Sequence, residues 1–410
     1  MRGQWIEIKT PAGEKFRGYL SVPESGSGPG LVVLQEIFGV NQHIREVTDQ
    51  YAEEGYIALA PEIFWRVEPG VELGYTADSI PKGRALAMKL NMDVTIKDID
   101  ATIATLRAMA ACSGKVAAVG YCFGGLLAFL TAARTDVDAA ISYYGGGIDA
   151  RADEAKSIKC PVMLHYGEKD HAIPAQARET ARKALASHPD AEIYLYREAE
   201  HGFNCSKRAS YHPFSAQLAR SRTIGLLRRT IGPRFDLSAL WDHHCDGEFT
   251  HRDVDETMQT MVAQPYVNHI PTLTGGYGYA ELYRFYKNHF IPRLPKDTKV
   301  VPLSRTVGSD RVVDEIMFCF THDMEIDFML PGIQPTGKYV EIPVVAIIEF
   351  RGDKLYNEHI YWDQGSLLAQ VGLLDTKKLP VAGIETAKKL KGEDIPSNQM
   401  MPTWRNSASK

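Results

Sequence analysis

Short apolar runs recur along the first 230 residues, and stretches with a helical repeat separate them. Apolar runs of this length are typical of strands buried on both faces of a sheet. Between them, apolar residues recur at helical spacing, as Ile99, Ile103 and Leu106 do before the third run. Because strand and helix alternate, we predict right-handed crossovers and a mainly parallel sheet covered on both faces. The runs are residues 30–34, 57–61, 115–120, 139–144, 161–167 and 192–196.

The pattern changes at the Gly232-Pro233 pair, a combination that interrupts regular structure. Beyond it, helical segments precede long runs with strand character, and residues 351–354 between two of these runs read as a hairpin turn. Helices followed by an antiparallel sheet indicate an α+β domain. The strand-like runs are residues 311–320, 340–351 and 354–362.

We therefore predict an α/β domain, an α+β domain and a C-terminal extension. The first covers residues 1–232 and the second residues 236–375. The extension, residues 376–410, is polar and contains Pro and Ser, so we expect it to be partly disordered.

Composition and charge narrow the class of protein. The chain has 410 residues, 44% hydrophobic and 24% charged, as expected for a globular protein of two or three domains. A net charge of −5 argues against nucleic-acid binding, and no apolar run approaches the ~20 residues that cross a bilayer. The N-terminus lacks a secretory signal, and the six cysteines include no Cys-x-x-Cys pair. These features favour a cytoplasmic protein with free thiols and no nucleic-acid or membrane partner.

A nucleophile elbow follows the third apolar run. Gly120-Tyr121-Cys122-Phe123-Gly124 has the Gly-x-nucleophile-x-Gly pattern, with cysteine in place of serine, and it opens an apolar helix. Small residues are needed because the nucleophile occupies a sharp, strained turn. The helix N-terminus next to the sulfur favours the thiolate, and the N–H of Phe123 is a candidate donor to an oxyanion.

Two further residues complete a candidate catalytic triad. Asp170 follows the fifth apolar run and His201 follows the sixth, so the chain order is nucleophile, acid, histidine, as in α/β-hydrolases. The aspartate would orient the imidazole, which moves protons to and from the nucleophile. Taken singly, Cys122, Asp170 and His201 could each be structural. Their common position at strand ends favours catalysis.

Four motifs resemble those of the dienelactone hydrolases (carboxymethylenebutenolidases), over about residues 1–230. The resemblance implies hydrolysis of a lactone or activated ester of a small, anionic metabolite, without a cofactor. It also implies that Glu36 lies close to the thiol of Cys122 and helps deprotonate it when substrate binds. A structural salt bridge is the alternative for Glu36. The N–H of Ile37 would be the second oxyanion donor. The motifs are residues 35–39, 120–125, 167–171 and 200–203.

The predicted substrate pocket departs from the family pattern in part. Arg84 matches an arginine that the resemblance implies binds the substrate carboxylate, although a solvated helix arginine is equally plausible. The family has a second basic residue soon after the histidine. Cys205 stands at that position here, with Lys207 and Arg208 just beyond it. The identity of the substrate therefore stays open.

The second half resembles the SnoaL-like polyketide cyclase domains of the nuclear transport factor 2 superfamily, over about residues 236–375. The motifs are residues 266–271, 278–286, 321–324 and 359–364. The resemblance implies a cone of helices and a curved antiparallel sheet around a pocket. No His-Glu-x-x-His or similar spacing occurs, so no metal site is predicted. The candidates for lining the pocket are His244, His269, His322, Asp323 and Glu358.

These features predict a cysteine-dependent hydrolase of a small-molecule ester or lactone. In one alternative, the second domain carries the activity as a cyclase or isomerase. In another, the protein is a metabolite-binding homodimer that associates through the second domain.

Overall fold

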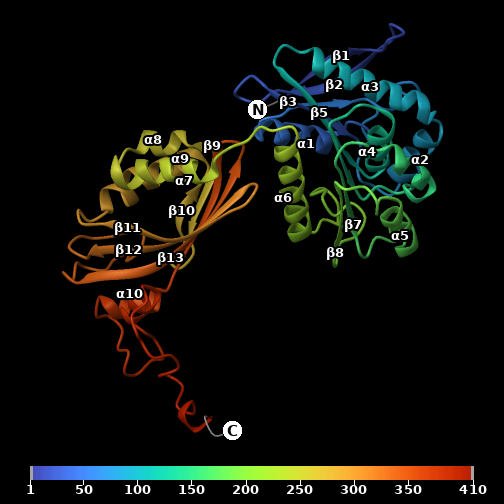
Figure 1. Ribbon diagram of the computed structural model, residues 1–410. Helices are drawn as coiled ribbons and strands as arrows, with labels where there is room; N and C mark the ends of the chain where they lie inside the picture. Colours follow the sequence, from blue (N-terminus) through green and yellow to red (C-terminus); the bar gives the residue numbers. More distant parts are fainter. Residues whose placement is uncertain (1–2, 408–410) are drawn as a thin grey trace. The chain divides into compact units, whose positions relative to one another are not determined.

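The chain forms two compact units, which divide between Arg234 and Phe235 (Figure 1). The computed structural model describes residues 3–407. Each unit has its own hydrophobic core, the first built around strands such as Leu31–Leu34 and the second around Phe320, Ile348 and their neighbours. Among residues 3–407, no helix is both long and apolar enough to cross a membrane.

The first unit contains an eight-stranded sheet in the order β1-β2-β4-β3-β5-β6-β7-β8. Neighbouring strands in the series β4-β3-β5-β6-β7-β8 pair in parallel. In contrast, β1 pairs with β2, and β2 with β4, in antiparallel fashion. The prediction of a mainly parallel sheet is confirmed, and the two antiparallel pairs make the sheet mixed. The bounds are β1 (Gln4–Lys9), β2 (Lys15–Ser21), β3 (Gly28–Leu34), β4 (Ile57–Pro61), β5 (Cys112–Tyr121), β6 (Ala139–Tyr143), β7 (Val162–Gly167) and β8 (Ala191–Tyr196).

Helices of the first unit pack on this sheet, and the loops at the carboxyl ends of its parallel strands hold the candidate catalytic residues. Helix α4 contacts β5 and β6, and α6 contacts β6 and β7. Because β3, β5, β7 and β8 run parallel, the loops that follow them emerge at the same edge of the sheet. The helices are α1 (Gln42–Glu53), α2 (Ser79–Met88), α3 (Met92–Ala108), α4 (Phe123–Arg134), α5 (Ala175–Ala184) and α6 (Pro213–Thr230), with a 3-10 segment at Asp149–Ser157.

The second unit contains a separate six-stranded sheet in the order β10-β9-β14-β13-β12-β11. All pairs are antiparallel except β14 with β9. The strands predicted at residues 311–320, 340–351 and 354–362 are confirmed as β12, β13 and β14. The strands are β9 (Met261–His269), β10 (Thr274–Tyr277), β11 (Lys299–Val307), β12 (Arg311–Thr321), β13 (Tyr339–Arg351) and β14 (Lys354–Trp362).

Short helices precede and follow the strands of the second sheet. Helices α7 (Leu237–Cys245) and α8 (Val254–Gln259) precede β9, and α9 (Tyr279–Phe285) lies between β10 and β11 in the chain. Helix α7 continues into a π-helical turn at Asp246–Thr250, and α9 into one at Tyr286–Phe290.

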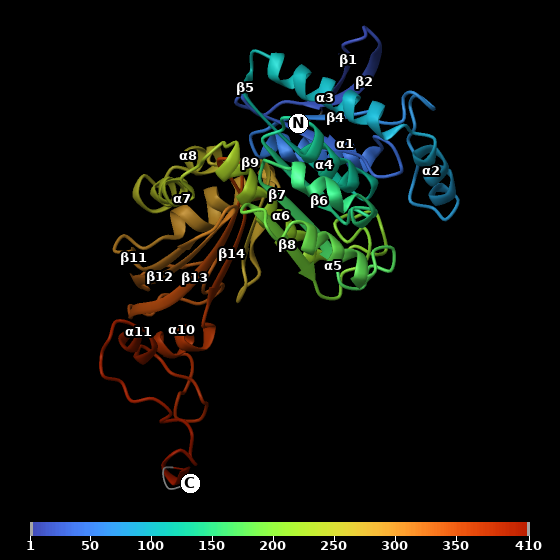
Figure 2. The ribbon, with the colours of Figure 1, turned by 45° about the vertical axis from the view of Figure 1, so that its right-hand side comes forward.

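Part of the predicted C-terminal extension is helical. Helix α11 (Glu385–Leu390) belongs to this extension and lies beside α10 (Gln364–Gln370), which precedes the extension, as the turned view shows (Figure 2). Ala387 of α11 is buried against Met317 and Cys319 of β12. A single buried alanine within a polar segment carries little hydrophobic signal, so the sequence pattern did not predict this helix.

Candidate active site

Cys122 lies in the turn between β5 and α4, in a strained backbone conformation. Its φ is 55° and its ψ is −114°. A Cβ atom at Gly120 would lie 1.8 Å from the carbonyl oxygen of Gly124, and one at Gly124 would lie 2.3 Å from that of Leu34. Both positions therefore require glycine. The N–H of Cys122 donates to the carbonyl oxygen of Tyr143 at 3.0 Å, which holds the turn in place.

A chain of hydrogen bonds joins Cys122, His201 and Asp170. Nε2 of His201 lies 3.1 Å from Sγ of Cys122, and Nδ1 lies 2.8 Å from Oδ2 of Asp170. The Asp170 carboxylate is fully buried, and its Oδ1 accepts from the N–H of Ala172 at 2.8 Å. The structure thus brings together three residues that follow β5, β7 and β8.

The charge of this cluster favours an imidazolium. Burial alone lowers the pKa of His201. The negative charge of Cys122 and the hydrogen bond to Asp170 oppose burial and raise this pKa from 6.5 to about 10. Once the thiol of Cys122 has lost its proton, an imidazolium beside the sulfur would stabilise the thiolate.

Glu36 follows β3, and its carboxylate contacts two other side chains in the interior of the first unit. The residue is fully buried; its Oε2 accepts from the hydroxyl of Tyr75 at 2.8 Å, and its Oε1 lies 3.3 Å from Nη1 of Arg208. The salt bridge that the sequence left open is therefore present. Burial lowers the pKa of Arg208, but the charges of Glu36, Tyr144 and Cys122 raise it above its ordinary value. Arg208 thus lies within electrostatic reach of both Glu36 and Cys122.

Arg208 is a site residue to which the sequence assigned no role. Gly202, next to His201, has a φ of 80°, and a Cβ atom there would lie 2.3 Å from Nη1 of Arg208. The glycine thus leaves room for the guanidinium beside Glu36. The available signal was a basic pair shortly after the histidine. Its other member, Lys207, pairs instead with Glu46 at 3.1 Å.

The remaining candidates of the first unit lie on α2, on α4 and in the loop after β3. Arg84 is exposed on α2. The adjacent Gly83 packs on the loop, because a Cβ atom there would lie 2.3 Å from the carbonyl oxygen of Ile37. Phe123 is the first residue of α4, and the N–H at that position has no carbonyl partner within a helix. Its ring stacks on Phe64, with centroids 6.2 Å apart.

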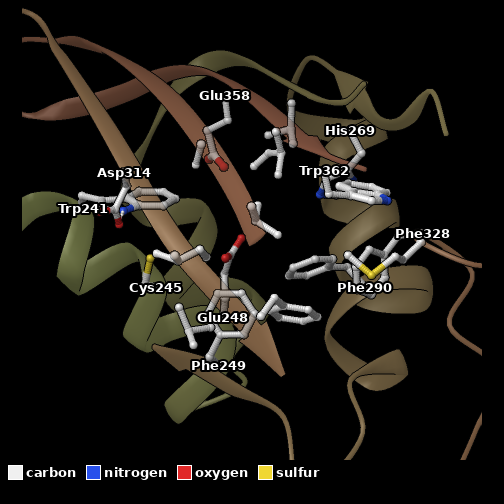
Figure 3. Close-up of a pocket in the computed structure, with 18 of the residues that line it drawn as sticks. Trp241, Cys245, Glu248, Phe249, His269, Phe290, Asp314, Phe328, Glu358 and Trp362 are labelled. Atoms are coloured by element: carbon white, nitrogen blue, oxygen red, sulfur yellow. Dashed lines mark hydrogen bonds between the residues drawn. The ribbon is translucent and has the colours of Figure 1, made fainter. Parts of the chain in front are cut away.

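The second unit contains a separate cavity with a volume of about 60 Å³. His269 and Glu358 line it, together with Glu248, which the sequence did not single out (Figure 3). His244 is fully buried and lies 3.2 Å from carboxylate oxygens of both glutamates. His322 and Asp323 do not line this cavity. His322 instead bonds Thr336 at 3.1 Å, and Asp323 is exposed.

Burial and neighbouring charges shift the pKa values of His244 and Glu358 in opposite directions. Burial lowers the pKa of His244, but the charges of Glu248 and Glu358 raise it to about 10. Burial raises the pKa of Glu358, and His244 opposes that shift. His269 has no acidic partner of this kind, and burial lowers its pKa to about 3.

The mixed sheet of the first unit, with a nucleophile elbow between β5 and α4, defines an α/β-hydrolase fold. Residues 16–231 match the model of the dienelactone hydrolase family. The chain belongs to this family, and the prediction of an ester or lactone hydrolase is confirmed as a class of enzyme.

Known relatives match the first unit over almost their whole length. The carboxymethylenebutenolidase of Pseudomonas putida is 33% identical over 231 residues, which are 55% of this chain and 97% of the relative. Carboxymethylenebutenolidase 1 of Cupriavidus pinatubonensis is 32% identical over 237 residues, 57% of this chain and 100% of the relative. A crystal structure of a candidate dienelactone hydrolase from Klebsiella pneumoniae has 32% identity and a TM-score of 0.50. It covers 56% of this chain and 100% of that one.

Proposed function

We propose that the protein is a cysteine-dependent hydrolase that cleaves the lactone or activated ester of a small, anionic metabolite of the dienelactone type. Cys122 is the nucleophile, His201 the proton carrier and Asp170 the residue that orients His201. The unbroken hydrogen-bond chain from Sγ through the imidazole to a buried carboxylate carries this proposal. Membership of the dienelactone hydrolase family supports it.

In the first step, the Cys122 thiolate attacks the carbonyl carbon and forms a C–S bond. The N–H groups of Phe123 and Ile37 stabilise the oxyanion. The C–O bond then breaks, and His201 protonates the departing oxygen. In the second step, His201 takes a proton from water, which attacks the thioester and releases a carboxylic acid and the thiol. Cysteine suits a substrate with an enol leaving group. A poorer leaving group would depart from the tetrahedral intermediate less readily than the thiolate itself, and the intermediate would return to substrate.

Arg208 and Arg84 supply the positive charge for an anionic substrate. A guanidinium binds a carboxylate through two parallel hydrogen bonds. In the free protein the partner of Arg208 is Glu36, at 3.3 Å. A substrate carboxylate would compete for the same guanidinium and release Glu36, which can then accept the thiol proton of Cys122. Substrate binding and nucleophile activation are thereby coupled.

The test is hydrolysis of a dienelactone and of an aryl ester by matched cysteine variants. Cys122→Ala should abolish turnover, and Cys122→Ser should keep the fold and lose most of the rate, because an alcohol is a far weaker acid than a thiol. Cys112→Ser, which alters a half-buried thiol at the start of β5, is the control and should retain full activity. Unchanged turnover in Cys122→Ala would rule out the proposal. Equal rates in Cys122→Ser would rule out the thiolate.

For the second unit we propose a SnoaL-like cone. The short helices, the six-stranded sheet and the cavity between them support this architecture. A cyclase or isomerase in place of the hydrolase is not favoured, because the family match and the Cys122–His201–Asp170 contacts all lie in the first unit. All six cysteines are free, which suits the reducing cytoplasm predicted from cysteine usage.

A further inference from the structure

Three buried ionisable side chains meet beside the second-unit cavity, and two of them, Glu248 and Glu358, line it. His244 comes from α7, Glu248 from the π-helical turn that follows it and Glu358 from β14. They are 0%, 4% and 1% exposed. Nε2 of His244 lies 3.2 Å from Oε1 of Glu248 and 3.2 Å from Oε1 of Glu358. Figure 3 shows the carboxylates of Glu248 and Glu358 directed into the cavity.

Hydrogen bonds fix the tautomer of His244. The hydroxyl of Thr260 donates to the carbonyl oxygen of Thr257 at 2.7 Å, so its proton is already used. Oγ1 of Thr260 must therefore accept from Nδ1–H of His244, 2.6 Å away. The other ring nitrogen, Nε2, faces two carboxylate oxygens. Its lone pair would repel them unless a cation, either a proton or a metal ion, lies between the three atoms.

A proton on Nε2 accounts for only one of these contacts. The N–H can donate along one direction, and it does so toward Oε1 of Glu248. Oε1 of Glu358 is equally close, yet it has no hydrogen-bond partner among the described residues. Buried polar atoms are normally satisfied, so this oxygen of Glu358 indicates a cation between it and Nε2 of His244.

We propose that His244, Glu248 and Glu358 bind a divalent transition-metal ion of the Zn²⁺ class. Zn–N and Zn–O bonds of about 2.0–2.2 Å place tetrahedral ligand atoms roughly 3.3–3.5 Å apart, close to the two separations of 3.2 Å. Thr260 orients the imidazole through the nitrogen away from the metal, as the outer partners of metal-bound histidines do. One imidazole with two carboxylates favours Zn²⁺, Co²⁺ or Mn²⁺ over Mg²⁺.

Three protein ligands leave one coordination position open, and the cavity gives access to it. Apolar and aromatic side chains such as Phe249, Phe318 and Trp362 form much of the remaining wall. The ligand that fits is a very small molecule with one oxygen donor, such as a carbonyl or carboxylate group, because the cavity volume is about 60 Å³. The metal would bind that oxygen and the aromatic wall would bind the carbon skeleton.

Metal content of the full chain tests the proposal. After incubation with excess Zn²⁺ and dialysis, wild type should retain one equivalent more than His244→Gln or Glu358→Gln. His269→Gln, which alters the same cavity outside the cluster, should match wild type. His43→Gln should also keep this equivalent; it removes a ligand from the other group that could hold an ion, Glu36, His43 and Cys205. Equal zinc content in wild type, His244→Gln and Glu358→Gln would overturn the proposal.

Two further measurements keep the test decisive if a variant folds poorly. Thermal unfolding of the second unit reports whether His244→Gln and Glu358→Gln fold. Co²⁺ bound to the wild-type chain should give visible d–d bands of a four- or five-coordinate site, and addition of one equivalent of Zn²⁺ should remove them. Wild type that binds neither ion would contradict the proposal, and the cation between the three side chains would then be a proton.

Discussion

The bond between Asp170 and His201 controls both the direction and the charge of the imidazole. In Asp170→Asn an amide replaces the carboxylate at nearly the same volume, so the fold should persist. The asparagine cannot stabilise the imidazolium and can favour the wrong tautomer, so kcat for ester hydrolysis should fall by about 10³–10⁴-fold. Steady-state kinetics measures the effect. Asp190→Asn, at an exposed carboxylate just before β8, is the control and should behave like wild type. A loss below tenfold would contradict the assigned role.

The pKa of His201 also links the stability of the first unit to pH. Its folded pKa, about 10, lies above the ordinary value of 6.5, so the folded state binds the proton more tightly than the unfolded state. The resulting stabilisation is fully present below pH 6.5 and disappears as pH rises through about 10. The difference in unfolding free energy between wild type and His201→Gln should therefore shrink between pH 6 and pH 10. Urea unfolding at several pH values measures it, and a constant difference would contradict the prediction.

At the level of residues, the sequence predicted contacts that depend on motifs at strand ends. Cys122, Asp170 and His201 each follow a recognisable apolar run, and the parallel order brings those ends to one edge. The contact between Glu36 and Arg208 spans 172 positions and depends on the space that Gly202 leaves. No local sequence pattern predicts a contact between residues so far apart in the chain.

The same reason explains why the metal-binding group escaped prediction. His244 and Glu248 are four positions apart, a helical spacing shared by many ordinary pairs. Glu358 joins them only because β14 crosses the second unit beside that helix. The absence of a known ligand motif was therefore a weak argument against a metal.

At the level of elements, the junction between β5 and α4 tolerates no added side chain. In Gly120→Ala the new Cβ atom would lie 1.8 Å from the carbonyl oxygen of Gly124, so backbone must move. We expect a loss of unfolding free energy of roughly 3 kcal/mol or more and a large fall in kcat, because Cys122 would shift relative to His201. Gly74→Ala, where a Cβ atom has no neighbour within 4 Å, is the matched control. Urea unfolding and ester hydrolysis of both variants should separate them; equal stability would show that the junction can relax.

Strands with a continuous apolar run were predictable from the sequence, and strands without one were not. The strands β3 to β8 include the continuous apolar runs from which the sheet was inferred. By contrast, polar residues interrupt the apolar residues of β1 and β2, so neither strand contains a continuous apolar run. The sequence therefore predicted the parallel part of the sheet and missed the two antiparallel pairs, β1 with β2 and β2 with β4.

At the level of the whole molecule, two separate cores divide the chain between Arg234 and Phe235. All residues of the proposed hydrolase lie before that point. Because a unit with its own core can fold alone, residues 1–234 should retain ester hydrolysis with kcat/KM within about threefold of the full chain. Residues 235–410 should show no such hydrolysis. An inactive but folded first unit would mean that the second unit contributes to the hydrolytic site.

The predicted homodimer can be tested on the same fragments, because association through the second unit requires residues 235–410. The full chain and residues 235–410 should then have twice their monomer mass by light scattering, and residues 1–234 should be monomeric. If hydrolysis by residues 1–234 also persists at the full rate, association and catalysis belong to different units. A dimeric first fragment with a monomeric second fragment would contradict the prediction, and it would direct the search for an interface to the α/β-hydrolase unit.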